Sequence, residues 1–290
     1  MNIEQNYIRV ALVGEDISAS LTPVMHEAEG KELVLHYSYR LIDTNSNATK
    51  IQSLAEIIAK AQSNGYAGLN ITFPYKIQVL QCLDKISRNT KMLGAANTVV
   101  FSGDRKIGYN TDITGFYESF RREMSGAIKD RVLLLGAGGA GVAVAFALAN
   151  LGVRELLIYD IDADQTKTLI NKVRLHQTSM SIDCINSLEK SILTELNGVV
   201  NATPMGMVKY PGSAFPLNLL TPSMWVADIV YFPLETELLV TAQTTGCRVM
   251  NGAGMAIFQA VHAFELFTGL KANVNRFIEK FEVLKNSMVV

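Results

Sequence analysis

The stretch Arg131-Val-Leu-Leu-Leu-Gly-Ala-Gly-Gly-Ala-Gly141, followed by Val142-Ala-Val-Ala-Phe-Ala-Leu-Ala149, decides the fold. An apolar run of the strand type leads directly into glycines, and a helical pattern begins immediately after them. Gly136, Gly138 and Gly141 occupy the three positions of the G-x-G-x-x-G fingerprint. The first glycine makes a tight turn, the second admits a pyrophosphate, and the third lets the helix pack closely on the strand. The stretch therefore predicts a βα turn that binds a dinucleotide at a helix N-terminus.

The acidic residue that completes this fingerprint stands at the end of the next apolar run, Leu156-Leu-Ile-Tyr-Asp160. It lies a little beyond the expected spacing of roughly twenty residues. A carboxylate there accepts hydrogen bonds from the ribose hydroxyls of an adenosine and repels a 2′-phosphate. No arginine or lysine follows until Lys167, so the sequence favours NAD over NADP. Two other interpretations stay open: a glycine-rich turn without a ligand, and an Asp160 or Asp162 that only caps the next helix.

Apolar runs and helical patterns alternate along nearly the whole chain, which is typical of an α/β protein with a largely parallel sheet. The first half predicts strands at 9–14, 37–42 and 68–72, helices at about 23–35 and 49–63, a helix opening near Pro74, and a hairpin of 97–100 with 106–109. A second series follows the polar segment Arg121–Lys129. It predicts strands at 132–135, 156–159, 182–185, 199–201 and 226–230, and an apolar helix at about 255–267.

The two series predict two α/β domains. The chain has 290 residues, of which 49% are hydrophobic, so it can fill two separate cores. We place the first domain at 1–112, completed by 252–290. We place a doubly wound, Rossmann-type dinucleotide-binding domain at 113–251, after which C-terminal helices return to the first domain.

Composition excludes several classes of function. A formal net charge of −1 leaves no basic surface for nucleic acid or an anionic membrane. Three widely separated cysteines and the absence of a secretion signal predict a cytoplasmic protein without a disulfide framework. The four histidines show no metal-ligand spacing, so we expect no metal site.

Polar side chains gather at the predicted ends of elements in the first half of the chain. Asn70-Ile-Thr-Phe-Pro-Tyr-Lys76 places a lysine just after a strand, and Gly108-Tyr-Asn-Thr-Asp112 closes the hairpin before a helix. Between them stands Leu93-Gly-Ala-Ala-Asn-Thr98. Ligand sites of α/β proteins form at such ends. Without further information, Lys76 could equally be a solvated helix-start residue and Asp112 a helix N-cap.

These motifs, taken in order, resemble the shikimate dehydrogenase family, and more closely its quinate/shikimate dehydrogenase members that use NAD. The resemblance covers nearly the whole chain in eight blocks: Ser20-Leu-Thr-Pro-Val-Met-His26, Asn70–Lys76, Gly94-Ala-Ala-Asn-Thr98, Asn110-Thr-Asp112, Gly136–Gly141, Asn201-Ala-Thr-Pro-Met-Gly206, Asp228-Ile-Val-Tyr231 and Met255-Ala-Ile-Phe-Gln259.

The resemblance implies a catalytic pair, Lys76 and Asp112, that shares the proton moved during oxidation of an alcohol, with Lys76 also stabilising charge on the substrate oxygen. It places the hydroxyls of Ser20 and Thr22 on the substrate carboxylate. Ring hydroxyls would be bound by Thr72, Asn97 and Gln259, with Tyr231 as an additional substrate or nicotinamide contact. Residues implied in cofactor binding are Gly136, Ala137, Gly138, Gly139, Ala140, Gly141, Asp160, Thr203, Pro204, Met205, Val230, Gly252 and Met255.

The implied activity is NAD-dependent, reversible oxidation of shikimate or quinate to the 3-dehydro acid, by a first domain that binds a small polyhydroxy carboxylic acid and a second that binds NAD. The enzyme is expected to be a monomer or a homodimer. The biosynthetic, NADP-linked members usually carry serine at the position of Thr22, and this departure, with Asp160, favours the NAD-linked type. Two alternatives remain: an NADP-linked biosynthetic shikimate dehydrogenase, and a catalytically silent NAD-binding sensor.

Overall fold

The computed structural model describes residues 7–46, 52–176, 179–191, 193 and 195–288. The chain divides into two compact units. Unit 1 comprises Met1–Thr111 and Ile257–Val290, and unit 2 comprises Asp112–Ala256. One long helix, α8 (Ala253–Thr268), begins in the second unit and continues into the first.

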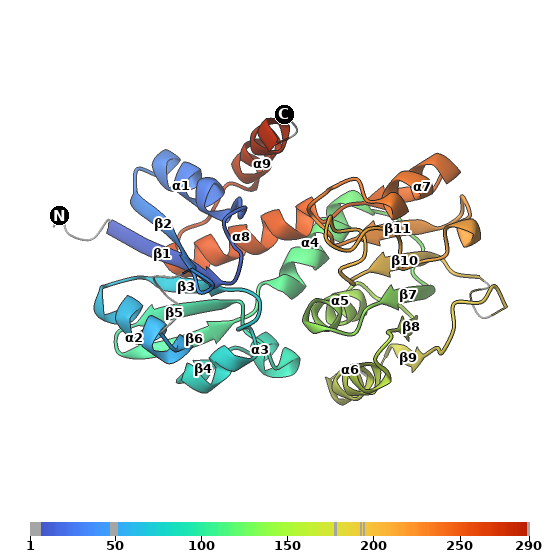
Figure 1. Cartoon of the computed structure of the whole chain (residues 1–290), viewed down its shortest axis with the longest axis horizontal. Coiled ribbons are helices and arrows are strands. Elements are labelled where there is room, and N and C mark those ends of the chain that lie inside the picture. Colours follow the sequence, from blue (N-terminus) through green and yellow to red (C-terminus); the bar gives the residue numbers. More distant parts are fainter. Residues whose placement is uncertain (1–6, 47–51, 177–178, 192, 194, 289–290) are drawn as a thin grey trace. The chain divides into compact units, whose positions relative to one another are not determined.

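Unit 1 is built on a mixed six-stranded sheet with the strand order β2-β1-β3-β5-β6-β4 (Figure 1). Neighbours β2, β1 and β3 are parallel, whereas β5 runs antiparallel to both β3 and β6. The predicted hairpin is β5 with β6. The strand bounds are β1 (Tyr7–Gly14), β2 (His36–Asp43), β3 (Gly68–Ile71), β4 (Lys85–Ile86), β5 (Thr98–Ser102) and β6 (Arg105–Tyr109).

Helices cover both faces of this sheet because successive strand residues alternate between faces. From β1, Ala11 and Val13 pack with the apolar stripe of α2 (Leu54–Ser63). The intervening Val10 and Leu12 pack on the other side with residues of α8. The remaining helical segments are α1 (Thr22–Glu32), the 3₁₀ turn η2 (Gln78–Cys82), α3 (Arg88–Leu93) and α9 (Val274–Met288).

Two helix predictions in this unit need correction. The described helix α2 begins at Leu54 and not near residue 49, because Ser53 caps it: the Ser53 side chain accepts from the Glu56 backbone, and Glu56 accepts in return; residues 47–51 lie outside the described part. No helix opens at Pro74. The Lys76 carbonyl accepts a hydrogen bond from Ala96, whereas the Leu80 N–H, which an α-helix would direct to Lys76, donates to Ile77, and η2 starts only at Gln78.

Unit 2 is a Rossmann-type doubly wound domain. Its six strands are all parallel, in the order β12-β11-β10-β7-β8-β9, which is the 3-2-1-4-5-6 arrangement of dinucleotide-binding folds (Figure 1). The bounds are β7 (Arg131–Leu135), β8 (Glu155–Tyr159), β9 (Ser181–Cys184), β10 (Gly198–Asn201), β11 (Trp225–Asp228) and β12 (Arg248–Met250). The short β12 was not predicted. Strand β11 ends two residues early, because the Asp228 carboxylate accepts the N–H of Val230 and turns the chain.

The helices of unit 2 are α4 (Asp112–Glu123), α5 (Gly139–Asn150), α6 (Ala163–His176), the 3₁₀ turn η3 (Leu217–Leu219) and α7 (Glu237–Thr245). Helix α5, which follows the glycines, is buried over most of its length, as its alanine- and valine-rich sequence predicts. Within the described residues, none of the helices has the length and apolar character needed to cross a membrane.

Candidate functional site

The glycine-rich turn of unit 2 lies where the strand order reverses, between β7 and β10. Gly136 follows β7 with φ +98°, a conformation that favours glycine. A Cβ atom at Gly136 would lie 2.8 Å from the carbonyl carbon and oxygen of Ala202, in the loop after β10. The two loops therefore approach each other at the switch point, the place where open α/β sheets bind ligands.

The three fingerprint glycines are required for different reasons. A Cβ at Gly141 would lie 2.0 Å from the Gly136 oxygen, so this glycine is needed for packing of α5 on the turn. At Gly138 the nearest atom to such a Cβ is the Gln165 side-chain oxygen, 3.9 Å away. No side chain in the described part of the chain caps α5 at Gly138. The fold itself does not demand this glycine, whereas a pyrophosphate at the helix N-terminus would.

Asp160 contacts the same turn. Its Oδ2 accepts a hydrogen bond from the Ala137 N–H at 2.6 Å, and its Oδ1 accepts from Asp162 at 2.8 Å. Helix α6 is capped by Asp162, which accepts from the backbones of Asp164 and Gln165. Those hydrogen bonds lower the pKa of Asp162. Capping is thus the role of Asp162, and Asp160 stands at the end of β8 beside the glycines.

A buried cluster joins the loops that follow β10 and β11. Both oxygens of Asp228 accept hydrogen bonds: Oδ1 from the Asn201 side chain (2.9 Å) and from the Val230 N–H (3.0 Å), and Oδ2 from the Thr236 hydroxyl (2.7 Å). Asn201 in turn accepts from the Thr203 backbone and hydroxyl and donates to the Met205 carbonyl. Burial raises the pKa of Asp228, although its three hydrogen bonds oppose this shift.

The cluster holds several of the predicted cofactor residues. Thr203 and Met205 are bound to Asn201, and Pro204 lies between them in the chain. Gly252 lies against the same region, because a Cβ there would come within 2.6 Å of the carbonyl oxygens of Ile229 and Val230. Met255 is half-buried in the first turn of α8, and the side chain of Tyr231 is 48% exposed.

In unit 1, four passages of the chain meet at one edge of the sheet. The Thr72 N–H donates to the Val13 carbonyl at the end of β1, and the Ile71 N–H donates to the Asn97 carbonyl. The Asn97 N–H donates in turn to the Tyr109 carbonyl at the end of β6. Because the Ala96 N–H donates to the Lys76 carbonyl, this edge also includes the Lys76 backbone beside Thr72 and Asn97, and the ligand-binding role of these residues stays a prediction.

The other predicted substrate residues also lie in unit 1. Ser20 and Thr22 are half-buried between β1 and the start of α1, and the Thr22 N–H is 3.4 Å from the Ser20 Oγ. Gln259 is half-buried on α8, one helical turn before Ala263, which packs on β1. Lys76 belongs to unit 1, whereas Asp112 is the buried first residue of α4 in unit 2. The pairing of these two residues stays a prediction.

Asn97 is the centre of a buried, uncharged cluster. Its Oδ1 accepts hydrogen bonds from the Thr111 N–H (2.9 Å), the Thr111 hydroxyl (3.3 Å) and the Thr98 hydroxyl (3.0 Å). Its Nδ2 donates to the Thr111 hydroxyl at 2.9 Å. Asn70 donates to Thr98 and to the Asn97 carbonyl. Asn70, Thr98 and Thr111 received no role from the sequence; the one available signal was a polar residue inside the short apolar strand Gly68-Leu-Asn-Ile71.

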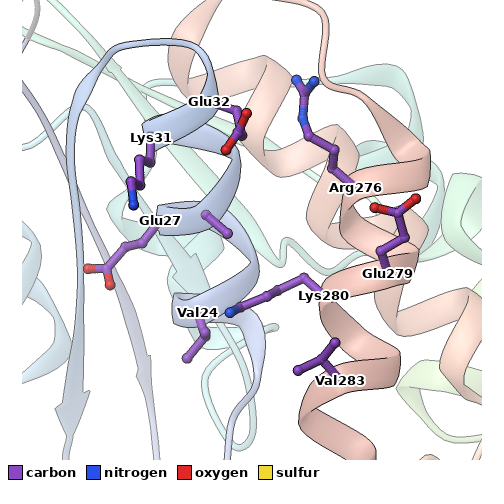
Figure 2. A pocket seen from close by; sticks show the side chains of 9 residues that line it. Val24, Glu27, Lys31, Glu32, Arg276, Glu279, Lys280 and Val283 are labelled. Carbon is purple, nitrogen blue, oxygen red and sulfur yellow. The ribbon is translucent and has the colours of Figure 1, made fainter.

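A groove of about 690 Å³ lies elsewhere on unit 1, between α1 and α9 (Figure 2). Glu29 of α1, which is buried beside it, accepts from the guanidinium and so holds Arg276 of α9. None of the predicted site residues lines the groove. Its lining carries charges of both signs and consists of Val24, Glu27, Ala28, Lys31, Glu32, Arg276, Glu279, Lys280 and Val283. Across the described residues, no group of three or more His, Cys, Asp or Glu side chains could hold a metal ion.

The chain is similar to known proteins over nearly its whole length. A family model described as "Shikimate dehydrogenase substrate binding domain" matches residues 12–99. The quinate/shikimate dehydrogenase (NAD(+)) of Corynebacterium efficiens is 46% identical over 93% of this chain and 95% of its own. The shikimate dehydrogenase (NADP(+)) of Streptomyces avermitilis is 41% identical over 99% of both chains. The solved structure of quinate dehydrogenase from Corynebacterium glutamicum in complex with NAD superposes with a TM-score of 0.90 at 41% identity, covering 96% of this chain and 99% of that one.

Proposed function

The chain belongs to the shikimate dehydrogenase family, and on that premise we propose that it oxidises shikimate, quinate or both, reversibly, with NAD as hydride acceptor. Unit 2 binds the dinucleotide, and unit 1 binds the polyhydroxy acid. When bound, the nicotinamide accepts the hydride from the alcohol carbon that becomes the ketone.

The observation that carries the proposal is the turn at the switch point of unit 2. Two of its glycines satisfy the fold, and the third, Gly138, leaves the N-terminus of α5 open to a pyrophosphate. Asp160 stands beside this turn, where a carboxylate accepts hydrogen bonds from the adenosine ribose. These residues fit a dinucleotide.

Asp160 also supports NAD over NADP. Relatives that use either cofactor are similarly close, at 41–46% identity, so overall similarity does not separate them. A carboxylate at this position repels a 2′-phosphate. Ile161, the next residue, is 96% exposed and uncharged, and Lys167 is engaged by Asp164 at 3.2 Å. Between Asp160 and Lys167 there is therefore no unengaged basic side chain to bind the 2′-phosphate of NADP.

Lys76 and Asp112 carry out the proton transfer. During oxidation the substrate hydroxyl must lose its proton as the hydride leaves, and during reduction the oxygen must gain one. The Nζ of Lys76 stabilises the charge that develops on this oxygen, and the Asp112 carboxylate shares the proton with it.

The remaining substrate residues are neutral, which suits a ligand rich in hydroxyls. The hydroxyls of Ser20 and Thr22 bind the carboxylate, and Thr72, Asn97 and Gln259 bind ring hydroxyls, with Tyr231 as a further contact. A buried polar side chain that loses its partner costs binding free energy, so such a site rejects acids that lack a hydroxyl.

Absorbance at the NADH band tests the proposal directly. The purified protein is mixed with shikimate or quinate and with NAD or NADP, in four combinations. We expect NADH to form with at least one acid, and kcat/KM to be much higher with NAD than with NADP. Absence of turnover in all four mixtures, with NAD binding intact by calorimetry, would support the silent sensor. Equal use of NADP would leave the dehydrogenase standing and overturn the NAD assignment.

A further inference from the structure

A chain of hydrogen bonds leads through the core of unit 1 from Tyr39, on β2, to Asn97. The Tyr39 hydroxyl donates to the Asn70 Oδ1 at 2.8 Å, and the Asn70 Nδ2 donates to the Thr98 hydroxyl at 3.0 Å. The Thr98 hydroxyl donates to the Asn97 Oδ1 at 3.0 Å. All four side chains are buried, with at most 6% of any residue exposed, so water cannot easily replace a lost link.

Two backbone groups fix the direction of every bond in this chain. A backbone N–H can only donate, so the Asn97 atom that receives the Thr111 N–H must be its oxygen. A backbone carbonyl can only accept, so the Asn70 atom 3.3 Å from the Asn97 carbonyl must be its nitrogen. The Asn70 oxygen therefore faces Tyr39, which must donate. Thr98 accepts from Asn70, and its own proton is directed to Asn97.

Tyr39 is held as a permanent donor. Burial raises the pKa of its phenol far above the ordinary value, so the hydroxyl keeps its proton. The neighbouring ring of His26 meets Tyr39 edge-on, with the centroids 5.0 Å apart. Burial also lowers the pKa of His26 to about 3, so this imidazole stays neutral at any pH at which the protein would work.

We propose that Tyr39 is a positioning residue: the Thr111 N–H sets which end of the Asn97 carboxamide is the oxygen, and Tyr39, through Asn70 and Thr98, holds the carboxamide in place so that its Nδ2 amino group meets the substrate. The Oδ1 of Asn97 already accepts three hydrogen bonds within the protein. An amino group can donate to a hydroxyl and equally to a carbonyl, so this orientation fits the substrate before and after oxidation. The inference rests on the proposed function, because the family resemblance is what assigns a substrate oxygen to Asn97.

Tyr39→Phe tests the proposal, with Tyr37→Phe as its matched control. Tyr37 lies two residues earlier on the same strand, and its hydroxyl is 2.9 Å from the His26 Nδ1, outside the chain to Asn97. We expect Y39F to lower kcat/KM for the acid about tenfold, as loss of one site hydrogen bond would. The KM for NAD and the Tm should change no more in Y39F than in Y37F, and Y37F should keep the kcat of the wild type.

Thr98→Val provides a second variant, because valine keeps the shape of threonine and removes the hydroxyl in the middle of the chain. T98V should reproduce the kinetic loss of Y39F. The double variant should lose little more than either single one, since both interrupt the same chain. Fully additive losses would show that Tyr39 does not act through Thr98 and would overturn the proposal.

A crystal structure of Y39F separates this proposal from the proposed function. We expect the Asn70 carboxamide to rotate and the Asn97 side chain to follow. Equal kinetic losses in Y39F and Y37F, or an unmoved Asn97 in that crystal structure, would overturn the positioning role while the dehydrogenase stands. If the wild type turned over neither acid, the proposed function would fail, and the position of Asn97 in the crystal structure would still decide whether Tyr39 holds it.

Discussion

The two units solve the same problem with different chemistry. Each holds the loops at one edge of its sheet with a buried polar cluster built around an asparagine, Asn97 in unit 1 and Asn201 in unit 2. Within the described residues, the hydrogen bonds traced around Asn97 join amides, hydroxyls and backbone groups. The cluster around Asn201 contains a carboxylate, Asp228, that accepts three hydrogen bonds.

The difference between the two clusters determines how strongly each holds its loops and how each responds to pH. A neutral cluster costs no desolvation of charge and keeps its geometry as pH changes, which suits the recognition of uncharged hydroxyls. Hydrogen bonds to a carboxylate are stronger, and those of Asp228 fix two loops at once. Their strength depends on ionisation, however, and burial opposes ionisation at Asp228. The cluster around Asn201 should therefore respond to pH, whereas the cluster around Asn97 should not.

The largest expected effect concerns the proposed pair of Lys76, in unit 1, and Asp112, in unit 2. Lys76→Ala should lower kcat by about 100- to 10,000-fold, the usual contribution of proton transfer by a positioned group. NAD affinity measured by calorimetry should stay near the wild-type value, because the residues predicted to bind the dinucleotide all belong to unit 2. Asp112→Asn should behave similarly, and the double variant should lose little more. Additive losses would show that the two residues do not act as a pair.

Exchanging the chemistry of the two clusters tests the comparison itself. A raised folded-state pKa means that Asp228 contributes most to stability below the ordinary carboxyl pKa, and that this contribution is lost as pH rises through the raised value. In Asp228→Asn this loss should disappear. Asn97→Asp places a carboxylate in the neutral cluster, where burial should raise its pKa, so this variant should be least stable at high pH.

Urea unfolding of the wild type and both variants between about pH 4 and 8 measures these opposite trends. We expect a difference in unfolding free energy across that range of about 1–3 kcal/mol per exchanged group, the usual cost of an unsatisfied or charged buried polar atom. The contrast between the two clusters would be disproved if the unfolding free energy of D228N kept the pH dependence of the wild type, or if that of N97D showed no pH dependence.

The cofactor edge of unit 2 offers a smaller effect. Asp160→Ser combined with Ile161→Arg removes the repulsion of a 2′-phosphate and adds a cation at an exposed position. The preference for NAD over NADP in kcat/KM should narrow by about 10- to 100-fold, which is the effect expected of one or two charged contacts. Ile161→Arg alone is the control and should narrow it less, since Asp160 remains. An equal effect of the single variant would show that Asp160 does not exclude NADP.

The Rossmann unit could be predicted from sequence in most of its detail because its signals are local. Gly136 and Gly141 are each demanded by atoms within about one turn or one neighbouring loop, and Asp160 ends the next strand. The short strands β4 and β12, of two and three residues, carry too little pattern to be recognised. The helix predicted at Pro74 was wrong: the Lys76 carbonyl faces Ala96, twenty positions along the chain, and the Leu80 N–H donates to Ile77 instead.

The cluster around Asn97 could not be predicted, because its contacts join residues that are far apart in the sequence. Tyr39 meets Asn70 across 31 positions, and Asn70 meets Thr98 across 28. No periodicity links such residues; only the order of strands β2-β1-β3-β5 brings them together. The family resemblance supplied Asn97 and Thr72 as substrate residues, but it could not supply the side chains behind them.

The smallest expected effect concerns Thr22, at the edge of unit 1. Quinate carries a hydroxyl on the ring carbon that bears the carboxylate, whereas shikimate has a ring double bond there. The Thr22 N–H is 3.4 Å from the Ser20 Oγ, so the two hydroxyls expected on the carboxylate belong to one short segment at the start of α1. The methyl group of threonine restricts χ1 and fixes where its hydroxyl points. Thr22→Ser should therefore change the ratio of kcat/KM for quinate and shikimate on the order of tenfold. The kcat/KM for the better of the two acids should change less than this ratio.

Thr22→Val, which keeps the shape of threonine and removes the hydroxyl, should instead lower kcat/KM for both acids together. A wild type that oxidises shikimate and leaves quinate untouched would remove quinate from the proposed substrates, and the substrate-binding edge of unit 1 would then be specific for the unsaturated ring.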